Sequence, residues 1–302
     1  MNQHSLPTTF TQRGTADQWR QRVGALCVGN SRLAFAVACA FAGPLLRVAG
    51  VESGGFHLRG GSSTGKTTAL KVAASVNGGA NYLQRWRTTD NALEAIAAQH
   101  CDALLVLDEL AQVDPKTAGE CAYMLANEQG KARATRNGAP RPRLSWRLLF
   151  LSAGELGLSN HIAEVQRLAR TVQEVRVADI PADAGAGMGM LQNLHGIEGG
   201  GAAFSRQIVA AAGQCYGAPG RDWLQWLTAN ADTIRADVIQ RMHDIEDDIL
   251  DFWSPNAVKH VGQRFALVGA AGEMATAAGL TGWPVGESKR AAQACFNAWR
   301  DV

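Results

Sequence analysis

The amino-acid sequence predicts an α/β fold, with a largely parallel β-sheet followed by a helical C-terminal region. Short apolar runs alternate with helical stretches between residues 55 and 180, a pattern typical of a parallel sheet covered by helices. A glycine-rich loop stands between the first apolar run and the first helix of this region. After residue 201 the apolar residues follow a helical period, and no stretch reads convincingly as a strand.

The composition is that of an ordinary globular protein. Of the 302 residues, 46% are hydrophobic and 19% are charged, so the chain can bury a sizeable core. The formal net charge of +2 is too small to indicate nucleic-acid binding by itself, and such a prediction must depend on local clusters of Lys and Arg. The 6 cysteines lie far apart without a C-x-x-C spacing, which predicts buried thiols in a reducing compartment.

Residues 1–50 are expected to form a helical lead-in. One or two helices are predicted between residues 15 and 49, with Asn30 or Ser31 as the N-cap of an apolar helix. A proline and an arginine interrupt the apolar stretch Leu33–Ala49, which favours a buried helix over a membrane span. The polar N-terminus lacks the apolar core of a signal peptide, so we expect a cytoplasmic protein that does not associate with membranes.

The sheet-forming core is expected to span residues 51–181, followed by a linker over 182–201 and a helical C-terminal subdomain over 202–302. The linker is rich in Gly, Ala and Met and shows no clear periodicity. Strands are expected at Gly55–Arg59, Asn81–Gln84, Ala103–Leu107, Arg147–Leu151 and Glu174–Val177. The C-terminal helices are expected at Ala202–Tyr216, Asp222–Asp251, Pro255–Ala278 and Glu287–Arg300.

Residues 60–67 fit the phosphate-binding pattern G-x-x-x-x-G-K-[ST] at every defined position. In this motif the backbone N–H groups of the loop and the N-terminus of the following helix bind phosphates. Lys66 is expected to reach the β- and γ-phosphates and Thr67 to hold Mg²⁺, so the predicted cofactors are ATP and Mg²⁺. The residues expected to bind the nucleotide are Gly60, Gly61, Ser62, Ser63, Thr64, Gly65, Lys66, Thr67 and Thr68.

A later apolar run, Ala103–Leu107, ends in the two carboxylates Asp108 and Glu109, as the Walker B motif does. Asp108 is expected to coordinate Mg²⁺ directly or through water. Glu109 is expected to orient and deprotonate the water that attacks the γ-phosphate. An apolar strand followed by Asp-Glu also occurs as a simple strand end, but here the pair follows an intact phosphate loop. The two motifs together predict ATP hydrolysis as well as binding.

Another apolar run ends near Ser152. Parallel strands bring their carboxyl ends to one edge of a sheet, so a polar side chain at this place could lie beside the γ-phosphate. Ser152 is therefore the candidate sensor that helps to position the attacking water. The alternative is a hydroxyl that satisfies a backbone group at the end of the strand.

Basic residues gather in the segment 130–143, which we call the basic segment. The pair Asn137-Gly138 within it predicts a hairpin turn. A basic hairpin suits contact with a nucleic-acid backbone, because Lys and Arg neutralise phosphates without reading sequence. The alternatives are a solvated loop and an arginine contact with a neighbouring subunit. The residues expected to contact DNA, without sequence preference and as a single strand, are Lys131, Arg133, Arg136, Arg141 and Arg143.

Three arginines are candidates for completing an ATPase site. Arg170 and Arg176 could reach into the site of a neighbouring subunit, where an arginine stabilises charge that develops on the transferred phosphoryl group. Arg264, in a predicted C-terminal helix, could act as a sensor of the nucleotide. The alternative for each is a surface or capping charge.

These motifs also carry a family resemblance. They are Gly29–Leu33, Gly54–Thr68, Leu107–Leu110, Gly130–Arg133 and Leu151–Glu155, continued by Arg264–Leu267 and Ala271–Ala275. They resemble the family called domain of unknown function 927, the Cch-like helicase ATPases of plasmids, prophages and other mobile elements. The resemblance implies a P-loop NTPase core of AAA+ type and a homo-oligomeric ring such as a hexamer.

The same resemblance implies an ATP-dependent DNA helicase or translocase motor for replication of a mobile element, with a primase or a replication initiator as possible partner. Priming itself is not expected of this sequence, because it contains no primase or zinc-binding region. Three other functions stay open. One is a related ATPase that loads DNA, packages it or switches with the nucleotide, without unwinding. Another is an inactive derivative that serves as a DNA-binding or assembly module. The third is a small-molecule kinase, which would use the same loop but has no support from the basic segment or the C-terminal helices.

Overall fold

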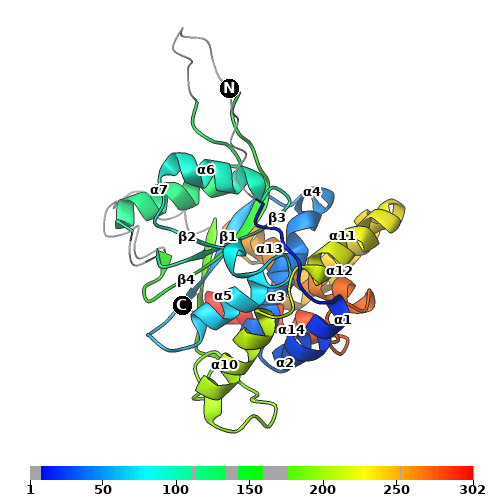
Figure 1. Cartoon of the computed structure of the whole chain (residues 1–302). Coiled ribbons are helices and arrows are strands. Elements are labelled where there is room, and N and C mark those ends of the chain that lie inside the picture. The colour runs from blue at the N-terminus through cyan, green and yellow to red at the C-terminus, as the bar shows by residue number, and fades with distance from the viewer. Residues whose placement is uncertain (1–7, 111–112, 133–141, 159–175, 252, 302) are drawn as a thin grey trace.

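The computed structural model describes residues 8–110, 113–132, 142–158, 176–251 and 253–301 and has a mixed α/β fold (Figure 1). Its N-terminal elements are α1 (Ala16–Trp19), η1 (Arg20–Gly24), α2 (Ala25–Cys27), α3 (Ser31–Ala42), η2 (Gly43–Leu45) and α4 (Leu46–Ala49). The following elements are β1 (Gly54–Arg59), α5 (Lys66–Ala74), η3 (Ala80–Tyr82), β2 (Leu83–Arg85), α6 (Asp90–Gln99), β3 (Ala103–Asp108), α7 (Pro115–Ala126), β4 (Leu148–Gly154) and β5 (Val177–Pro181). The C-terminal elements are α10 (Gly200–Ala212), α11 (Ala218–Ala229), α12 (Ala231–Ile249), α13 (Asn256–Ala277) and α14 (Glu287–Arg300).

The five strands form one parallel sheet in the order β2-β3-β4-β1-β5. This confirms the parallel sheet expected from the alternation of apolar runs and helices. The strand that precedes the glycine-rich loop, β1, is not paired with β3, because β4 lies between them. The first four strands lie within a few residues of their expected positions.

The fifth strand lies further along the chain than expected. It was placed at residues 174–177, whereas β5 begins at Val177 and ends at Pro181. The polar residue Asp179 interrupts the apolar run and conceals the strand in the sequence. In the structure Asp179 is buried, and its Oδ1 accepts a hydrogen bond from the backbone N–H of Leu158 at 2.9 Å. A buried carboxylate with such a partner is compatible with a strand, here the edge strand beside β1.

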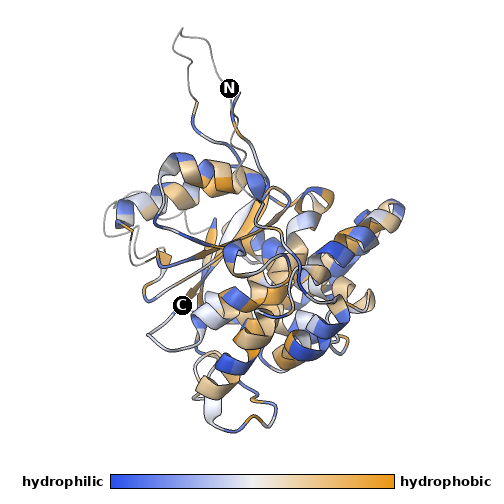
Figure 2. Ribbon diagram, viewed as in Figure 1, coloured by the Kyte–Doolittle hydropathy of each residue, from blue (hydrophilic) through white to orange (hydrophobic). Residues whose placement is uncertain are grey.

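Helices cover both faces of the sheet. Along β3, Leu104 and Val106 point into the larger core, which also contains residues of α3, α5, α13 and α14. Leu105 and Leu107 point to the other face and pack with residues of α6 and α7. Because both faces are covered, the strands are apolar at nearly every position. Figure 2 shows the hydrophobic residues gathered along the strands and on the helices beside them.

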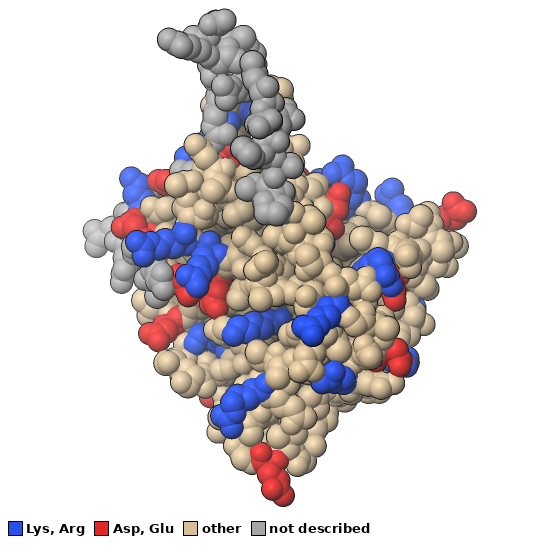
Figure 3. Space-filling model, viewed as in Figure 1, with Lys and Arg blue, Asp and Glu red and all other residues tan. Residues whose placement is uncertain are grey.

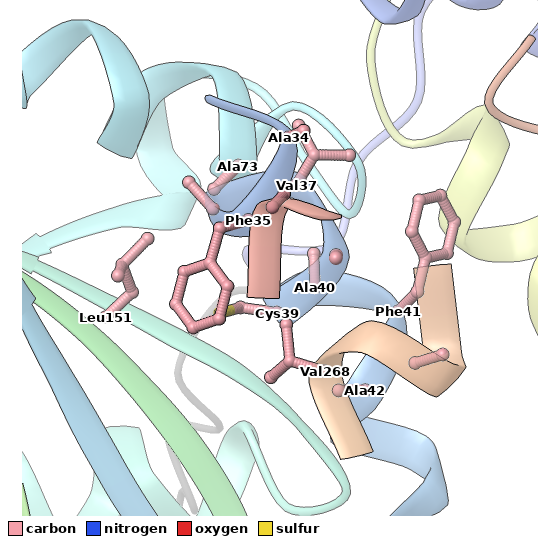
Figure 4. Packing of buried hydrophobic residues seen from close by; sticks show 14 of the residues in the cluster. Ala34, Phe35, Val37, Cys39, Ala40, Phe41, Ala42, Ala73, Leu151 and Val268 are labelled. Atoms are coloured by element: carbon pink, nitrogen blue, oxygen red, sulfur yellow. The ribbon is translucent and has the colours of Figure 1, made fainter. Parts of the chain in front are cut away.

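Helix α3 lies inside the larger core. Every residue from Arg32 to Ala42 is buried, and Phe35 points toward the sheet near Leu151 (Figure 4). Within the part of the chain that the structure describes, the stretch Ser31–Ala49 alone is long and apolar enough for a membrane span, and 78% of its most apolar window is buried inside the fold. This burial agrees with the expected core helix.

The C-terminal helices share this core and do not form a separate packing unit. The ring of Phe265 in α13 lies 5.3 Å from Phe35 of α3, 4.9 Å from Phe56 of β1 and 5.4 Å from Phe296 of α14, between ring centroids. The helix expected at Asp222–Asp251 is divided into α11 and α12 at Asn230. The side chain of Asn230 donates to a carbonyl of α11, and its backbone leaves the helical region.

The segment expected to be a linker, residues 182–201, is packed against the rest of the chain. The buried Asn30 accepts hydrogen bonds at its Oδ1 from the backbone N–H groups of Gln192 (2.8 Å) and Asn193 (3.0 Å). Its Nδ2 donates to the carbonyl of Asn193 at 2.8 Å. Asn30 therefore stands at the N-cap position of α3, as expected. Its side chain does not cap the helix but binds residues 192 and 193.

We expect Phe265→Ala to lower the free energy of unfolding by about 3–5 kcal/mol, because it removes a fully buried ring and leaves a cavity between three other aromatic residues. Urea unfolding followed by circular dichroism measures this change. The control is Val285→Ala, since Val285 is 88% exposed and its truncation should change stability by less than about 0.5 kcal/mol. Equal stability of the two variants would contradict the assignment of Phe265 to the centre of the core.

Candidate active site

The carboxyl ends of the strands border a cavity of about 850 Å³. One part of its wall is the glycine-rich loop after β1 with the first turn of α5, residues 62–68. A second part comes from the ends of β3 and β4, including residues 108–110 and 153–155. The third part comes from residues 187–189 and 191 and from the start of α10. Three segments that are distant in the sequence therefore meet at one edge of the sheet.

The glycine-rich loop turns sharply into α5. Gly65 has φ 95°, and a Cβ atom at this residue would lie 2.8 Å from Cγ of Met190. Both the left-handed backbone and the close packing therefore require glycine. Lys66 is the first residue of α5, and its Nζ donates to the carbonyls of Gly60 and Gly61, each at 2.6 Å. The N-terminus of α5 therefore lies at the cavity, where the N–H groups of a first helical turn can bind an anion.

Lys66 lies among negative charges at the centre of this wall. Partial burial lowers the pKa of Lys66, and the charges of Glu155 and Asp108 oppose that shift. Both carboxylates belong to the cavity wall, one after β4 and the other at the end of β3. The cavity therefore combines one ammonium group with carboxylates on the side of β3 and β4.

The carboxylates of Asp108 and Glu109 have different partners. The Oδ1 atom of Asp108 accepts a hydrogen bond from the backbone N–H of Glu109 at 2.8 Å. Glu109 has φ 63°, a strained value for a residue with a side chain. Its Oε2 lies 3.4 Å from Nε of Arg85, the last residue of β2. Both carboxylates line the cavity, and Arg85 lies beside the second one.

Thr67 and Asp108 offer oxygen ligands on the same cavity, and oxygen is the ligand type that Mg²⁺ prefers. Mg²⁺ is commonly held by one or two protein groups together with phosphate oxygens and water. Among the described residues, no group of three or more His, Cys, Asp and Glu side chains could hold a metal ion by itself. The residues present fit a magnesium ion that arrives with a nucleotide.

Ser152 does not reach the cavity. It is completely buried, and its Oγ accepts from Nε1 of Trp86 at 2.8 Å and lies 3.0 Å from Nδ1 of His57. His57 in turn lies 3.0 Å, through Nε2, from the carbonyl of Leu156. The Ser152 hydroxyl of β4 therefore joins His57 of β1 to Trp86, which follows β2. The sensor role expected of Ser152 is corrected to a structural one. The cavity is lined instead by Ala153, Gly154 and Glu155.

The candidate arginines that the structure describes also lie away from the cavity. Arg176 precedes β5, at the opposite end of the sheet, where it donates to Oδ1 of Asn127 and lies over the ring of Tyr123 at 4.8 Å. Arg264 is 4% exposed and packs against Gly54 at the amino end of β1. Burial lowers the pKa of Arg264 to about 10. The sensor role of Arg264 is therefore corrected, and Arg170 lies outside the described residues.

The basic segment leaves the fold through a short antiparallel ladder. The N–H of Gly130 donates to the carbonyl of Leu144 at 2.9 Å, and Gln129 pairs with Ser145. The buried carboxylate of Glu94 accepts from the backbone N–H of Lys131 at 3.1 Å. The ladder agrees with the expected hairpin, and the side chains of Lys131 and Arg143 are exposed. Arg133, Arg136 and Arg141 lie outside the described residues.

A salt bridge fixes the base of this ladder to the sheet. Glu128 lies 3.2 Å from Nε of Arg147 and accepts from the backbone N–H of Ser53 at 3.0 Å. Arg147 directly precedes β4, and Ser53 directly precedes β1. The basic segment therefore starts from the amino end of the sheet, opposite to the cavity. On the face shown in Figure 3, other Lys and Arg residues form separate patches, several of them beside Asp or Glu.

Two features of the cavity were not predicted from the sequence. Glu155 lies one residue beyond β4, and its place at a carboxyl end of the sheet could have revealed it. The glycine-rich run at residues 185–189 was interpreted as part of a linker. Gly189 is so close to the phosphate loop that a Cβ atom would lie 2.7 Å from the carbonyl oxygen of Thr64. Its glycines indicated close approach of two backbones.

The fold and the site define the class of protein: a mixed α/β protein whose parallel sheet holds a glycine-rich loop and a pair of carboxylates around one cavity. Residues 1–144 match the family model described as domain of unknown function (DUF927). The family resemblance expected from the motifs is therefore confirmed over this part of the chain. The matched region contains the glycine-rich loop and Asp108-Glu109 and ends before β4.

A solved structure described as "SCCmec type IV Cch - active helicase" is similar to this protein, with a TM-score of 0.65 and 20% sequence identity. The similarity covers 89% of this chain and 48% of that chain, so this protein spans about half the length of its structural relative. At this identity the likeness shows a common fold. Among curated proteins, none matches the sequence.

We expect Ser152→Ala to lower the free energy of unfolding by about 1–3 kcal/mol, because the buried Trp86 N–H and His57 lose a partner. The affinity for a fluorescent ATP analogue should stay unchanged, since Ser152 does not line the cavity. Urea unfolding and equilibrium titration measure the two effects. Thr228→Ala, which removes an exposed hydroxyl from α11, is the control and should change neither. Weaker nucleotide binding with unchanged stability would restore the sensor role.

Proposed function

We propose that this protein is an ATP-hydrolysing motor of the P-loop NTPase class and AAA+ type. The observation that carries the proposal is the single cavity shared by the phosphate-loop residues 62–67 and the carboxylates Asp108 and Glu109. Phosphate binding alone would need only the loop. The carboxylates beside it supply what hydrolysis requires in addition, a metal ligand and a base.

Phosphate binding follows from the loop geometry. The first turn of α5 presents backbone N–H groups and the positive end of the helix dipole to the cavity. Lys66 donates to two loop carbonyls, and on nucleotide binding its Nζ would exchange these for oxygens of the β- and γ-phosphates. Thr67 and Asp108 would hold Mg²⁺, which neutralises phosphate charge when bound.

Glu109 is the proposed general base. Its carboxylate would accept a proton from the water that attacks the γ-phosphate. Nε of Arg85 lies 3.4 Å from Oε2 of this carboxylate, so the base would stand beside a positive charge at the edge of the cavity. Glu155 lies on the same cavity and adds negative charge near Lys66. Removing the Lys66 charge would therefore leave Asp108 and Glu155 without the ammonium group with which they interact.

DNA is the proposed track. Lys131 and Arg143 extend from the antiparallel ladder on exposed side chains, and Arg133, Arg136 and Arg141 lie between them in the sequence. Contacts to phosphates through Lys and Arg would be independent of base sequence. The name of the structural relative describes that protein as an active helicase, which supports translocation and unwinding as the output here.

The oligomer and its partners are part of this proposal. A homo-oligomeric ring would place Arg170 or Arg176 of one subunit at the site of the next, and Arg176 would have to leave Asn127 and Tyr123 to do so. The motor would serve replication of a mobile element in the cytoplasm, with a primase or initiator. A DNA loader or packaging ATPase would use the same cavity, and strand displacement on forked DNA separates that function from a helicase.

We expect Lys66→Ala to abolish ATP binding and Glu109→Gln to keep binding while lowering kcat about 100-fold or more, because only the second variant retains the phosphate contacts. ATPase assays and titration with a fluorescent ATP analogue measure turnover and affinity. Lys71→Ala, an exposed lysine further along α5, is the control for Lys66 and should behave like the wild type. Full turnover by Glu109→Gln would exclude Glu109 as the base.

We expect the triple variant Lys131→Ala/Arg133→Ala/Arg136→Ala to retain basal ATPase activity and lose stimulation by single-stranded DNA, because the basic segment starts at the end of the sheet opposite to the cavity. The salt dependence of DNA binding should also become less steep. The control removes three exposed arginines elsewhere, Arg13, Arg235 and Arg300. Wild-type stimulation of the first variant would show that DNA binds at another surface.

A further inference from the structure

The cavity has two sides that differ in chemistry. The phosphate loop follows β1, in the middle of the sheet. On the side of β3 and β4, the wall carries Asp108, Glu109 and Glu155. On the side of β5, the wall consists of residues 187–189, Leu191 and the start of α10. One side is acidic, and the other is formed by small and apolar residues.

We propose that the wall on the side of β5 is the nucleoside subsite, and that it accepts purine and pyrimidine nucleoside triphosphates with little discrimination. This inference rests on the proposed function. The carboxylates and Lys66 place the metal and the terminal phosphate on the side of β3 and β4. The sugar and the base must then extend across the phosphate loop to the other side, where the cavity continues along residues 187–189, Leu191 and the start of α10.

The chemistry of this wall is suited to the face of any base. Its side chains are those of Met188, Leu191 and Ala202, with glycine at 187, 189 and 201. A Cβ atom at Gly187 would meet no atom within 4 Å, so the wall is open at this point. Among the described residues on this side, Ser205 of α10 supplies the one polar side chain. A thioether and methyl groups can pack against the face of a base, but they do not form hydrogen bonds with the donors and acceptors at its edge.

Several backbone groups of this wall are already used. The N–H of Met190 donates to the carbonyl of Thr64 at 3.0 Å, and the N–H of Leu191 donates to the carbonyl of Met188 at 3.3 Å. The carbonyl of Gly189 accepts from the N–H of Ala184 at 2.8 Å. The N–H groups of Met190 and Leu191 are therefore not available to donate to the edge of a base. A site that recognised one base would need such groups directed into the cavity.

The subsite is also formed before a ligand arrives. Arg32 donates to the carbonyls of Pro181 (3.0 Å) and Asp183 (3.2 Å) at the start of the loop, and Asn30 holds Gln192 and Asn193 at its end. Between these two attachments, the loop is hydrogen-bonded to the phosphate loop through Met190. The wall is thus attached to the fold at both ends and to the phosphate loop between them, which reduces the ordering that nucleotide binding requires.

The first test separates the nucleoside from the phosphates. Ala202 is exposed and lines the cavity, so Ala202→Trp should fill the subsite without disturbing the core. We expect its affinity for ATP to fall tenfold or more, while its affinity for inorganic tripolyphosphate stays at the wild-type value, both in the presence of Mg²⁺ and measured by calorimetry. The control is Ala210→Trp, on an exposed position of the same helix outside the cavity, which should change neither affinity.

The outcomes distinguish this inference from the proposed function. If the wild type binds both ligands and Ala202→Trp binds ATP as well as the wild type does, the nucleoside lies elsewhere and the inference is overturned. If Ala202→Trp loses both ligands, the substitution acts on the phosphate loop, and the inference is also overturned. If the wild type binds neither ligand, the proposed function itself fails.

The second test measures base selectivity with the wild-type protein. Competition of ATP, GTP, CTP and UTP for one fluorescent nucleotide gives their relative affinities. We expect all four to lie within about 200-fold of one another, the range that apolar contacts can produce. A wider range would overturn the weak discrimination, because it requires hydrogen bonds to the edge of one base.

Discussion

The insertion of β4 between β1 and β3 is the constraint on which the candidate active site depends. Parallel strands bring their carboxyl ends to one edge of a sheet. The register pairs Arg59 of β1 with Gly154 of β4, and Val106 of β3 with Leu151 of β4, so the three strands end close together. The loop after β1 and the carboxylates at the end of β3 therefore border one cavity, although α5, η3, β2 and α6 lie between them in the sequence.

The elements that could be predicted from the sequence are those whose patterns are local. The glycine-rich loop needs a few residues of fixed type between a strand and a helix, and Lys66 and Thr67 follow from the pattern itself. Asp108 and Glu109 could be predicted because an apolar run ends directly before them. The parallel sheet followed from the alternation of apolar runs and helices, and only β5, with the buried Asp179 inside it, was misplaced.

What could not be predicted depends on contacts between distant segments. A serine at the end of a buried strand can face a cavity or the interior. Ser152 faces the interior, where its hydroxyl contacts Trp86 and His57. The apolar period of α13 does not reveal that Arg264 lies at the amino end of β1. The composition of residues 182–201 is typical of a linker, because nothing in that segment indicates that Asn30 binds it.

Strand β4 also connects the two ends of the molecule. Arg147, directly before it, joins the base of the basic segment through Glu128, and Glu155, directly after it, borders the cavity. Its 7 residues of extended chain span roughly 20 Å. A pull on the basic segment would load this strand along its length, and its hydrogen bonds to β1 and β3 would share that load in shear. In the proposed motor, β4 would therefore connect the segment that contacts DNA with the edge of the cavity where phosphate binds.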